Sequence, residues 1–194
     1  MKNWKLVEIP QLMKHLELDA RGYPIPYIVM RDKTGKAHFA LNDEQLTECC
    51  ITNDLCSICG LEMKGDSWMI GGPMSTFHPQ GCFIDIPVHH ECGKYALQVC
   101  PYLAVTVYNP KTDVDTLQNQ EKFDNAYFIN PTMSKDRVPF FVFSHISGYT
   151  VKRPRFGERY IYPNKPYLNH EFWNAGEKIT QEEVHRLIEL KEVI

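Results

Sequence analysis

Residues 56–60 read Cys56-Ser57-Ile58-Cys59-Gly60, and this stretch decides the fold of the chain. Two cysteines separated by two residues can bind one tetrahedral metal ion where the backbone turns tightly between them. A glycine after the second cysteine permits the left-handed backbone conformation that such a turn requires. Redox proteins also use Cys-x-x-Cys, but no strand–helix–strand pattern follows this motif. The motif therefore indicates one half of a metal site.

The other half is His89-His90-Glu91-Cys92, which follows Pro87. Proline can end an extended segment and open a helix, which puts His89 and Cys92 on one face of the first helical turn. The two motifs together predict a closed set of three thiolates and one imidazole, the type that binds structural Zn²⁺. The spacing leaves open whether His90 replaces His89 and whether Cys82 competes as a ligand. The expected zinc ligands are Cys56, Cys59, His89 and Cys92.

The connection between the two motifs determines the type of zinc module. A cysteine turn, a connecting segment and a ligand-bearing helix follow one another in the order of a treble clef. We expect the connection to hold a β-hairpin, with residues 68–70 as the first strand, a turn at Gly71-Gly72 and a return through residues 83–84. The helix should continue from residue 93 to 100, where Pro101 ends it.

Composition sets the class of protein. The chain has 194 residues and a net charge of -3, so it is long enough to bury a core and gives no support to general polycationic binding of nucleic acid. No apolar run approaches the ~20 residues of a membrane span. The first twelve residues do not resemble a signal peptide, so we expect a cytoplasmic protein without membrane contact. In a reducing cytosol, the seven cysteines between residues 49 and 100 indicate metal binding rather than disulfides.

The remaining pattern predicts an α+β fold, with the treble-clef zinc module embedded in short antiparallel strands and a C-terminal helix. We divide the chain into an N-terminal α+β region, residues 1–104, that contains the zinc module at 54–103, and a β-rich region, residues 105–194. The two should form one continuous globule. Aromatic and β-branched runs predict the strands. Asn42 is the expected N-cap of one helix, and Thr180-Gln181-Glu182-Glu183 forms a capping box that opens the C-terminal helix. Strands are expected at 23–30, 38–41, 104–108, 138–143, 149–152 and 159–162, and further helices at 42–50 and 180–192.

A basic, aromatic-rich stretch at residues 134–165 is a candidate binding surface. Cations that contact phosphates, interleaved with aromatic rings that stack on bases, suit single-stranded DNA or RNA. Alternation with a period of two favours a plain solvated hairpin instead, and an acidic partner protein would also fit. The candidate nucleic-acid or partner-binding residues are Lys135, Arg137, Lys152, Arg153, Arg155 and Arg159.

Enzymatic function has weaker support in the sequence. A nuclease built on a treble clef needs a catalytic histidine and an open metal position. The eight histidines show no His-Asn-His spacing, and Asn169-His170-Glu171 is expected to lie in a loop. A metal-dependent nuclease remains the least favoured alternative.

Several strings resemble a family of small bacterial and phage proteins with a Cys-x-x-Cys-Gly and His-x-x-Cys centre. The resemblance covers the middle and both ends of the chain but not residues 105–160. In that family a cysteine follows Gly-Pro-Met, whereas Ser75 stands there in this chain, so such a cysteine is not an essential ligand here. The resemblance implies a metal-containing fold and no particular activity. The strings are Arg21-Gly22-Tyr23-Pro24, Cys56-x-x-Cys59-Gly60, Gly72-Pro73-Met74, His89-x-x-Cys92 with Cys100-Pro101-Tyr102-Leu103, and Trp173-x-Ala175-Gly176-Glu177.

These observations predict a zinc-containing, non-enzymatic binding or regulatory protein with a protein partner. The narrower expectation is a phage accessory factor that inhibits or redirects a host complex. A module for single-stranded nucleic acid that uses the basic stretch is the main alternative.

Overall fold

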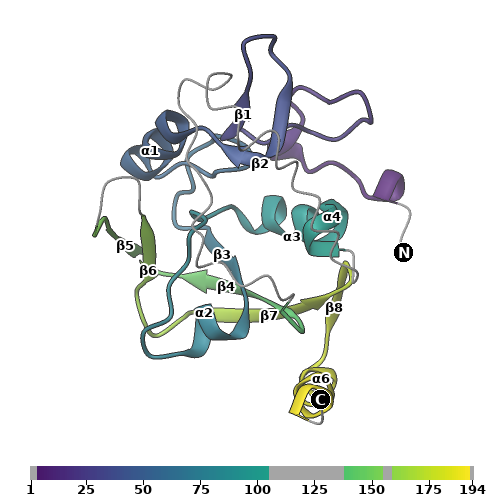
Figure 1. Ribbon diagram of the computed structural model, residues 1–194, viewed down its shortest axis with the longest axis vertical. Coiled ribbons are helices and arrows are strands. Elements are labelled where there is room, and N and C mark those ends of the chain that lie inside the picture. Colours follow the sequence, from purple (N-terminus) through teal and green to yellow (C-terminus); the bar gives the residue numbers. More distant parts are fainter. Residues whose placement is uncertain (1–3, 105–137, 155–158, 193–194) are drawn as a thin grey trace.

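A four-stranded antiparallel sheet combines strands from both halves of the chain (Figure 1). The computed structural model describes residues 4–104, 138–154 and 159–192. Within them the strand order of this sheet is β3-β4-β7-β8. The expected α+β class is confirmed, with antiparallel sheets and a C-terminal helix. The sheet strands are β3 (Ser67–Gly71), β4 (Phe141–Ile146), β7 (Asn169–Asn174) and β8 (Glu177–Ile179).

Strand β4 lies inside the sheet and forms the centre of the core. It pairs with β3 on one side and with β7 on the other. Its aromatic and β-branched residues suit a strand that is buried on both faces. Phe143 packs against Gly93 of the helix at 90–99, whereas Val142 joins the cluster around the C-terminal helix on the opposite face. The sheet is therefore covered on both sides.

Helix α3 (His90–Val99) covers one face of the sheet, and α6 (Gln181–Glu192) packs on the other. A Cβ atom added at Gly93 would lie 2.5 Å from the ring of Phe143, so only glycine allows this approach of α3 to the sheet. At the start of α6, Thr180 Oγ1 accepts a hydrogen bond from Glu183 N, and Glu183 Oε2 accepts one from Thr180 N. The capping box that opens this helix is thus confirmed.

The N-terminal part forms a separate hairpin and helix. Strands β1 (Val29–Arg31) and β2 (Ala37–Asn42) pair around a turn at residues 32–36. Helix α1 (Glu44–Asn53) follows at once, and its N-cap is Asp43, whose Oδ1 accepts a hydrogen bond from Leu46 N. We expected Asn42 as the cap, but that residue is the last of β2. The carboxylate one position later reaches the free amide groups of the first turn instead.

The shorter elements connect these parts. Figure 1 shows the β1–β2 hairpin at the top of the molecule, the main sheet below it and α6 at the bottom. Strands β5 and β6 form a second two-stranded sheet. The remaining elements are the 3-10 helices Trp4–Leu6 and Gln11–Met13, the helices α2 (Pro73–Phe77) and α4 (Pro101–Ala104), and the strands β5 (Tyr149–Lys152) and β6 (Tyr160–Pro163).

The structure corrects the hairpin expected between the two metal motifs. Strand β3 does follow the cysteine motif, but it pairs along its whole length with β4. The Gly71-Gly72 pair does not form a hairpin turn, because Gly72 is the N-cap of α2. The chain returns to β3 only at Val88, which exchanges two backbone hydrogen bonds with Trp68, while Phe83 pairs with Ile161. The long-range partner β4 therefore pairs with all of β3 on one edge, and the returning chain forms only a single bridge on the other edge.

One further expectation differs from the structure, one agrees with it, and one lies outside it. The segment at 165–179 holds the strands β7 and β8, so the expected loop around Asn169-His170-Glu171 is wrong. The helix that carries Cys92 begins at His90, with His89 as its N-cap, so Cys92 lies in its first turn as expected. The strand expected at 104–108 lies outside the described residues, apart from Ala104, which ends α4. Within residues 4–104, 138–154 and 159–192, each helix is too short or too polar to cross a bilayer.

Candidate metal centre

A tight backbone turn presents the first two ligands. Leu55 and Glu62 form an antiparallel bridge on either side of it. Inside the bridge, Cys56 N donates to Leu61 O at 2.9 Å, and Gly60 N donates to Cys56 O at 2.8 Å. Gly60 adopts a φ of +73°, and a Cβ atom there would lie 2.7 Å from the ring of Tyr27. A glycine is needed at this position both for its backbone conformation and for the close ring.

The start of helix α3 presents the other two ligands. His89 is the N-cap residue, and its carbonyl oxygen accepts the hydrogen bond of Gly93 N at 2.9 Å. Cys92 lies in the first turn, as the sequence predicted. The segment just before the helix is attached to both neighbours: Ser57 N donates to Pro87 O, and Val88 pairs with Trp68. These contacts hold the helix start against the cysteine turn.

The four predicted ligands come together at one point. The donor atoms of Cys56, Cys59, His89 and Cys92 all lie within 4.8 Å of one another, and all four residues are buried. His89 Nδ1 lies 3.3 Å from Cys59 Sγ. Among the described residues, this is the one group of three or more such side chains that could hold a metal ion. The quartet can therefore bind one metal ion, and three sulfurs with one imidazole nitrogen match a structural zinc site in type.

Neighbouring backbone groups support the ligands. His89 N donates to Cys56 Sγ at 3.3 Å, and His89 Nε2 donates to the carbonyl oxygen of Glu62 at 3.1 Å. On the other side, the carbonyl oxygen of Cys59 accepts a hydrogen bond from His15 Nε2 at 3.0 Å. Such outer contacts orient the ligating side chains and fix the protonated ring nitrogen. The quartet also belongs to the larger apolar cluster that includes Trp68, Tyr95 and Phe143.

The electrostatics of the quartet favour a cation. Burial would raise the pKa of the Cys56 thiol, but hydrogen bonds with Cys59, Cys92 and His89 outweigh burial and hold this pKa well below its usual range. Hydrogen bonds with Cys56 and Cys59 raise the pKa of His89 to about 10. The same two cysteines, together with burial, raise the pKa of Cys92. Without a metal, the protons of His89 and Cys92 compensate the negative charge of Cys56. A divalent cation would take the place of these protons.

The two alternatives that the sequence left open are decided by geometry. His90 turns away from the quartet, and its Nε2 donates to Glu171 Oε1 at 3.2 Å. Cys82 is half-buried and is not part of the ligand group. His89 and Cys92 therefore complete the set.

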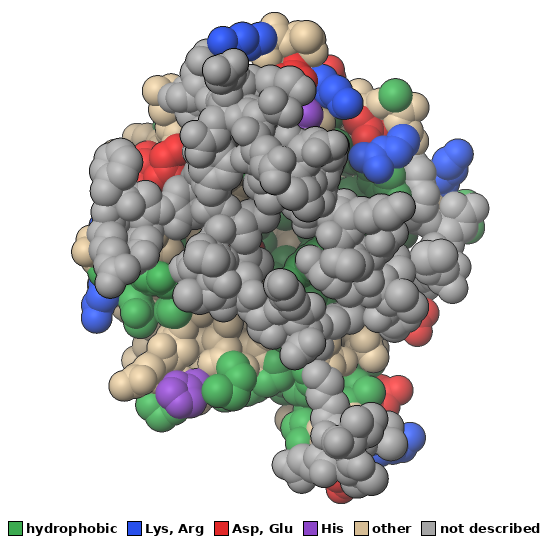
Figure 2. Space-filling view, viewed as in Figure 1, with side chains coloured by type: hydrophobic (Ala, Val, Ile, Leu, Met, Phe, Trp, Pro, Cys, Tyr) green, Lys and Arg blue, Asp and Glu red, His purple; other side chains and the backbone are tan. Residues whose placement is uncertain are grey.

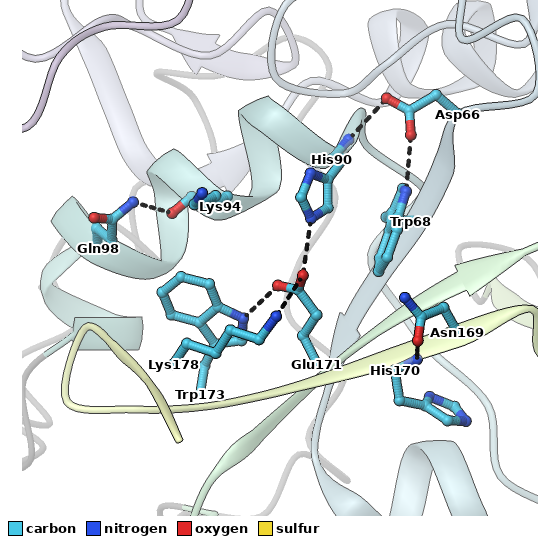
Figure 3. A network of polar contacts seen from close by, with 10 residues as sticks. All are labelled: Asp66, Trp68, His90, Lys94, Gln98, Asn169, His170, Glu171, Trp173 and Lys178. Carbon is cyan, nitrogen blue, oxygen red and sulfur yellow. Dashed lines mark hydrogen bonds and ion pairs between the residues drawn. The ribbon is translucent and has the colours of Figure 1, made fainter. Parts of the chain in front are cut away.

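A network of polar contacts joins the start of α3 to the sheet (Figure 3). Glu171 on β7 accepts hydrogen bonds from His90, from Lys178 Nζ at 3.0 Å and from Trp173 Nε1 at 3.1 Å. Asp66 accepts one from His90 N at 3.1 Å and one from Trp68 Nε1 at 2.8 Å. The network fixes His90 by its backbone and by its ring, which directs the adjacent His89 to the other side.

Sequence reasoning missed this network, because its members are spread from residue 66 to 178. Burial of Glu171 would raise the pKa of its carboxyl group, but hydrogen bonds with Lys178, His90 and Trp173 outweigh burial and lower it. Glu171 is only 9% exposed, so its charge depends on these three donors. The alternation of Glu171 and Trp173 was the one local signal of a strand in this segment.

The structure describes three of the six basic candidates. Arg159 is 4% exposed and binds Glu44 Oε1 at 2.8 Å and Glu48 Oε1 at 3.2 Å, while Arg153 pairs with Glu48 Oε2. Lys152 lies over the ring of Tyr162, at 4.6 Å from its centroid. The two arginines thus attach the β5–β6 sheet to α1. Lys135, Arg137 and Arg155 lie outside the described residues, and the binding role of all six stays a prediction.

No protein-family model, curated protein or solved structure matches this chain. The geometry of the site therefore carries the functional argument.

Proposed function

We propose that this chain is a non-enzymatic protein-binding or regulatory module whose fold is stabilised by one structural Zn²⁺ ion. The observation that carries the proposal is the closed ligand set, in which three cysteines and one histidine supply all four donors of a tetrahedral site. A catalytic zinc keeps one position for water or substrate, whereas a structural zinc does not. All four ligands are buried, which further supports a structural role.

Zinc is the metal that suits these donors best. Thiolate and imidazole select zinc over calcium, magnesium and manganese, which prefer oxygen ligands. Binding to such a set can contribute about 10–16 kcal/mol of apparent free energy, comparable to the ~5–15 kcal/mol stability of a whole domain. We expect the region around residues 54–103 to depend on the metal for its folding.

A treble clef is the module type that we propose for this region. Three features support it: the cysteine turn closed by the Leu55–Glu62 bridge, a β3 strand that meets the returning chain at Val88, and the ligand-bearing start of α3. The hairpin is reduced to a single bridge between Trp68 and Val88, on the edge of β3 opposite β4. The expectation of a phage accessory factor that inhibits a host complex stays a prediction.

The experiment uses the full chain purified without chelators. Elemental analysis should find one zinc per chain, and the protein should form a stoichiometric complex with a protein partner. It should not hydrolyse single- or double-stranded nucleic acid, with or without added Mg²⁺. Hydrolysis that disappears in His90→Ala while zinc is retained would assign an enzymatic function and overturn the proposal.

One observation favours binding of single-stranded nucleic acid as a second candidate. The register of β5 and β6 places Thr150, Lys152, Tyr160 and Tyr162 on the same face, opposite the buried Ile161. Tyrosine rings beside a lysine can stack on bases and contact phosphates. Against this candidate, Arg153 and Arg159 already bind carboxylates of α1.

Salt dependence tests the second candidate. Affinity for a labelled oligothymidylate should fall steeply with salt, and Lys152→Ala should reduce the slope by about one. Lys64→Ala is the matched control, because Lys64 is 77% exposed and belongs to the turn before β3. An affinity that does not respond to salt rejects nucleic-acid binding.

A further inference from the structure

Two large apolar side chains project from helix α2 into solvent. Met74 is 70% exposed and Phe77 is 50% exposed. They are three residues apart, so they lie on the same face of this short helix. Leu168, which precedes β7, is 57% exposed. We call Met74, Phe77 and Leu168 the apolar patch, and Figure 2 shows hydrophobic side chains beside a histidine along the lower edge of the molecule, where α2 and β7 lie in Figure 1.

The surroundings of the apolar patch are rigid although its side chains are exposed. Tyr167 donates a hydrogen bond from its hydroxyl group to Thr76 O at 3.1 Å, which attaches the segment before β7 to α2. The ring of His170 lies 5.4 Å from that of Phe77 and 4.8 Å from that of Tyr167. Ser144 Oγ lies 2.9 Å from His170 Nδ1 and fixes this ring. A preorganised apolar surface loses little freedom when a partner binds.

The charge around the apolar patch is of one sign. The described residues 67–84 and 163–170, which hold the patch and its neighbours, contain no aspartate or glutamate. They contain one lysine, Lys165, and no arginine. Lys165 lies next to the patch, and its Nζ donates to the carbonyl oxygen of His78 at 3.3 Å. A partner with acidic side chains around apolar ones would complement this surface.

We propose that the apolar patch binds an acidic, amphipathic segment of a partner protein. Apolar side chains of the segment would pack on Met74, Phe77 and Leu168, and its carboxylates would lie near Lys165. An amphipathic helix presents such anchors at a spacing of three or four residues. Two of the three patch residues are aliphatic and cannot stack on bases, which favours a peptide over nucleic acid. The inference deepens the proposed function and rests on it.

The test screens a library of displayed short peptides for binding to the zinc-loaded full chain. Peptides that also bind the double variant Met74→Ala/Phe77→Ala are discarded. Both side chains are exposed, so this variant should keep its zinc and its circular dichroism spectrum. Selected peptides should carry net negative charge, with Leu, Phe or Met at helical spacing. The Kd of a synthesised peptide should rise at least tenfold in the double variant and also rise in Lys165→Glu. Leu6→Ala, which removes an apolar side chain that is 82% exposed elsewhere, should leave Kd unchanged.

Other outcomes overturn the assignment. Selected peptides that are neutral or basic would rule out an acidic segment as the ligand of the apolar patch. A Kd that is the same in the double variant would rule it out too. A dimer that Phe77→Ala disrupts would make a second copy of this chain the occupant, and competition by oligothymidylate would make it nucleic acid. A partner complex that forms equally well with the double variant overturns the patch but leaves the proposed function standing. A chain that binds no protein at all overturns the proposed function itself.

Discussion

His89 and Glu62 are joined by a hydrogen bond of 3.1 Å between the imidazole Nε2 and the backbone carbonyl oxygen. A carbonyl oxygen only accepts, so Nε2 carries the proton. When a metal ion replaces the second proton of the ring, the lone pair is on Nδ1, which faces Cys59 Sγ at 3.3 Å. The bond connects the two halves of the metal centre, because Glu62 follows the cysteine turn and His89 precedes α3. It therefore determines which ring nitrogen would bind a metal ion.

Nuclear magnetic resonance can test this choice of nitrogen. In the zinc-loaded protein, long-range proton–nitrogen spectra should show His89 with a protonated Nε2, and substitution of zinc by cadmium-113 should give a coupling to Nδ1. The Glu62 carbonyl fixes this tautomer. A cadmium coupling to Nε2 would contradict the geometry.

Metal content should depend on the quartet alone. Cys59→Ser should lose the zinc and unfold at least the region around residues 54–103, because binding of the ion is coupled to folding. Cys82→Ser makes the same chemical change outside the ligand group, so it should keep one zinc per chain, as should His90→Ala. Elemental analysis and thermal unfolding of these three variants and of His89→Ala check this. Zinc lost from His90→Ala and kept in His89→Ala would reverse the ligand assignment.

Glu171 should stabilise the fold in a manner that depends on pH. Its three donors lower its pKa below the ordinary 4.5, despite the opposing effect of burial. A carboxyl group whose pKa is lower in the folded than in the unfolded state stabilises the folded state at pH values above its unfolded pKa. This stabilisation is lost as the pH falls through its folded pKa. Glu171→Gln should therefore cost about 1–3 kcal/mol of unfolding free energy at pH 7. The cost should shrink below pH 4.5.

Denaturant unfolding at several pH values measures this difference between the wild type and Glu171→Gln. The control is Glu17→Gln, whose side chain is 66% exposed in an ion pair with Arg31 and should change stability little at any pH. A cost for Glu171→Gln that is the same at pH 7 and pH 3.5 would show that the charge is not responsible.

Gly93→Ala should destabilise the protein, although alanine is the better helix former by about 1 kcal/mol. The new methyl group would lie 2.5 Å from Phe143 Cζ and 2.8 Å from Val88 Cγ2. Overpacking of this kind costs about 1–3 kcal/mol. Phe143→Leu in the same chain should recover part of the loss, which a double-mutant cycle of unfolding free energies measures. A more stable Gly93→Ala variant would mean that α3 does not approach the sheet so closely.

The ligand quartet could be read from the sequence because each half is a local motif. The spacing of Cys56 and Cys59 requires a tight turn, and Pro87 marks the start of the helix that carries Cys92. The capping box of α6 is local in the same way, since Thr180 and Glu183 satisfy each other within one turn. Interactions within a few residues have few alternatives, so the residue types alone restrict them.

The choice between His89 and His90 depended on residues far away in the chain. The two histidines are adjacent, and either could be the ligand by spacing. Glu171, 81 positions further on, binds the His90 ring, and Asp66 binds its backbone. The backbone carbonyl oxygen of Glu62 accepts a hydrogen bond from Nε2 of His89. Only the folded sheet brings these acceptors to the start of α3.

By itself, the sequence determined the two ligand motifs, the mixed α+β composition and the C-terminal helix. The tertiary structure decided the strand partners: β3 pairs along its whole length with β4, 71–79 positions away, and meets its own returning segment only at Val88. It also decided that Arg153 and Arg159 bind α1 and that Met74 and Phe77 remain on the surface. The physical reason is the range of the interactions. Capping and chelation depend on residues that are close together in the sequence. Strand pairing and burial depend on contacts between segments that can be far apart in the chain.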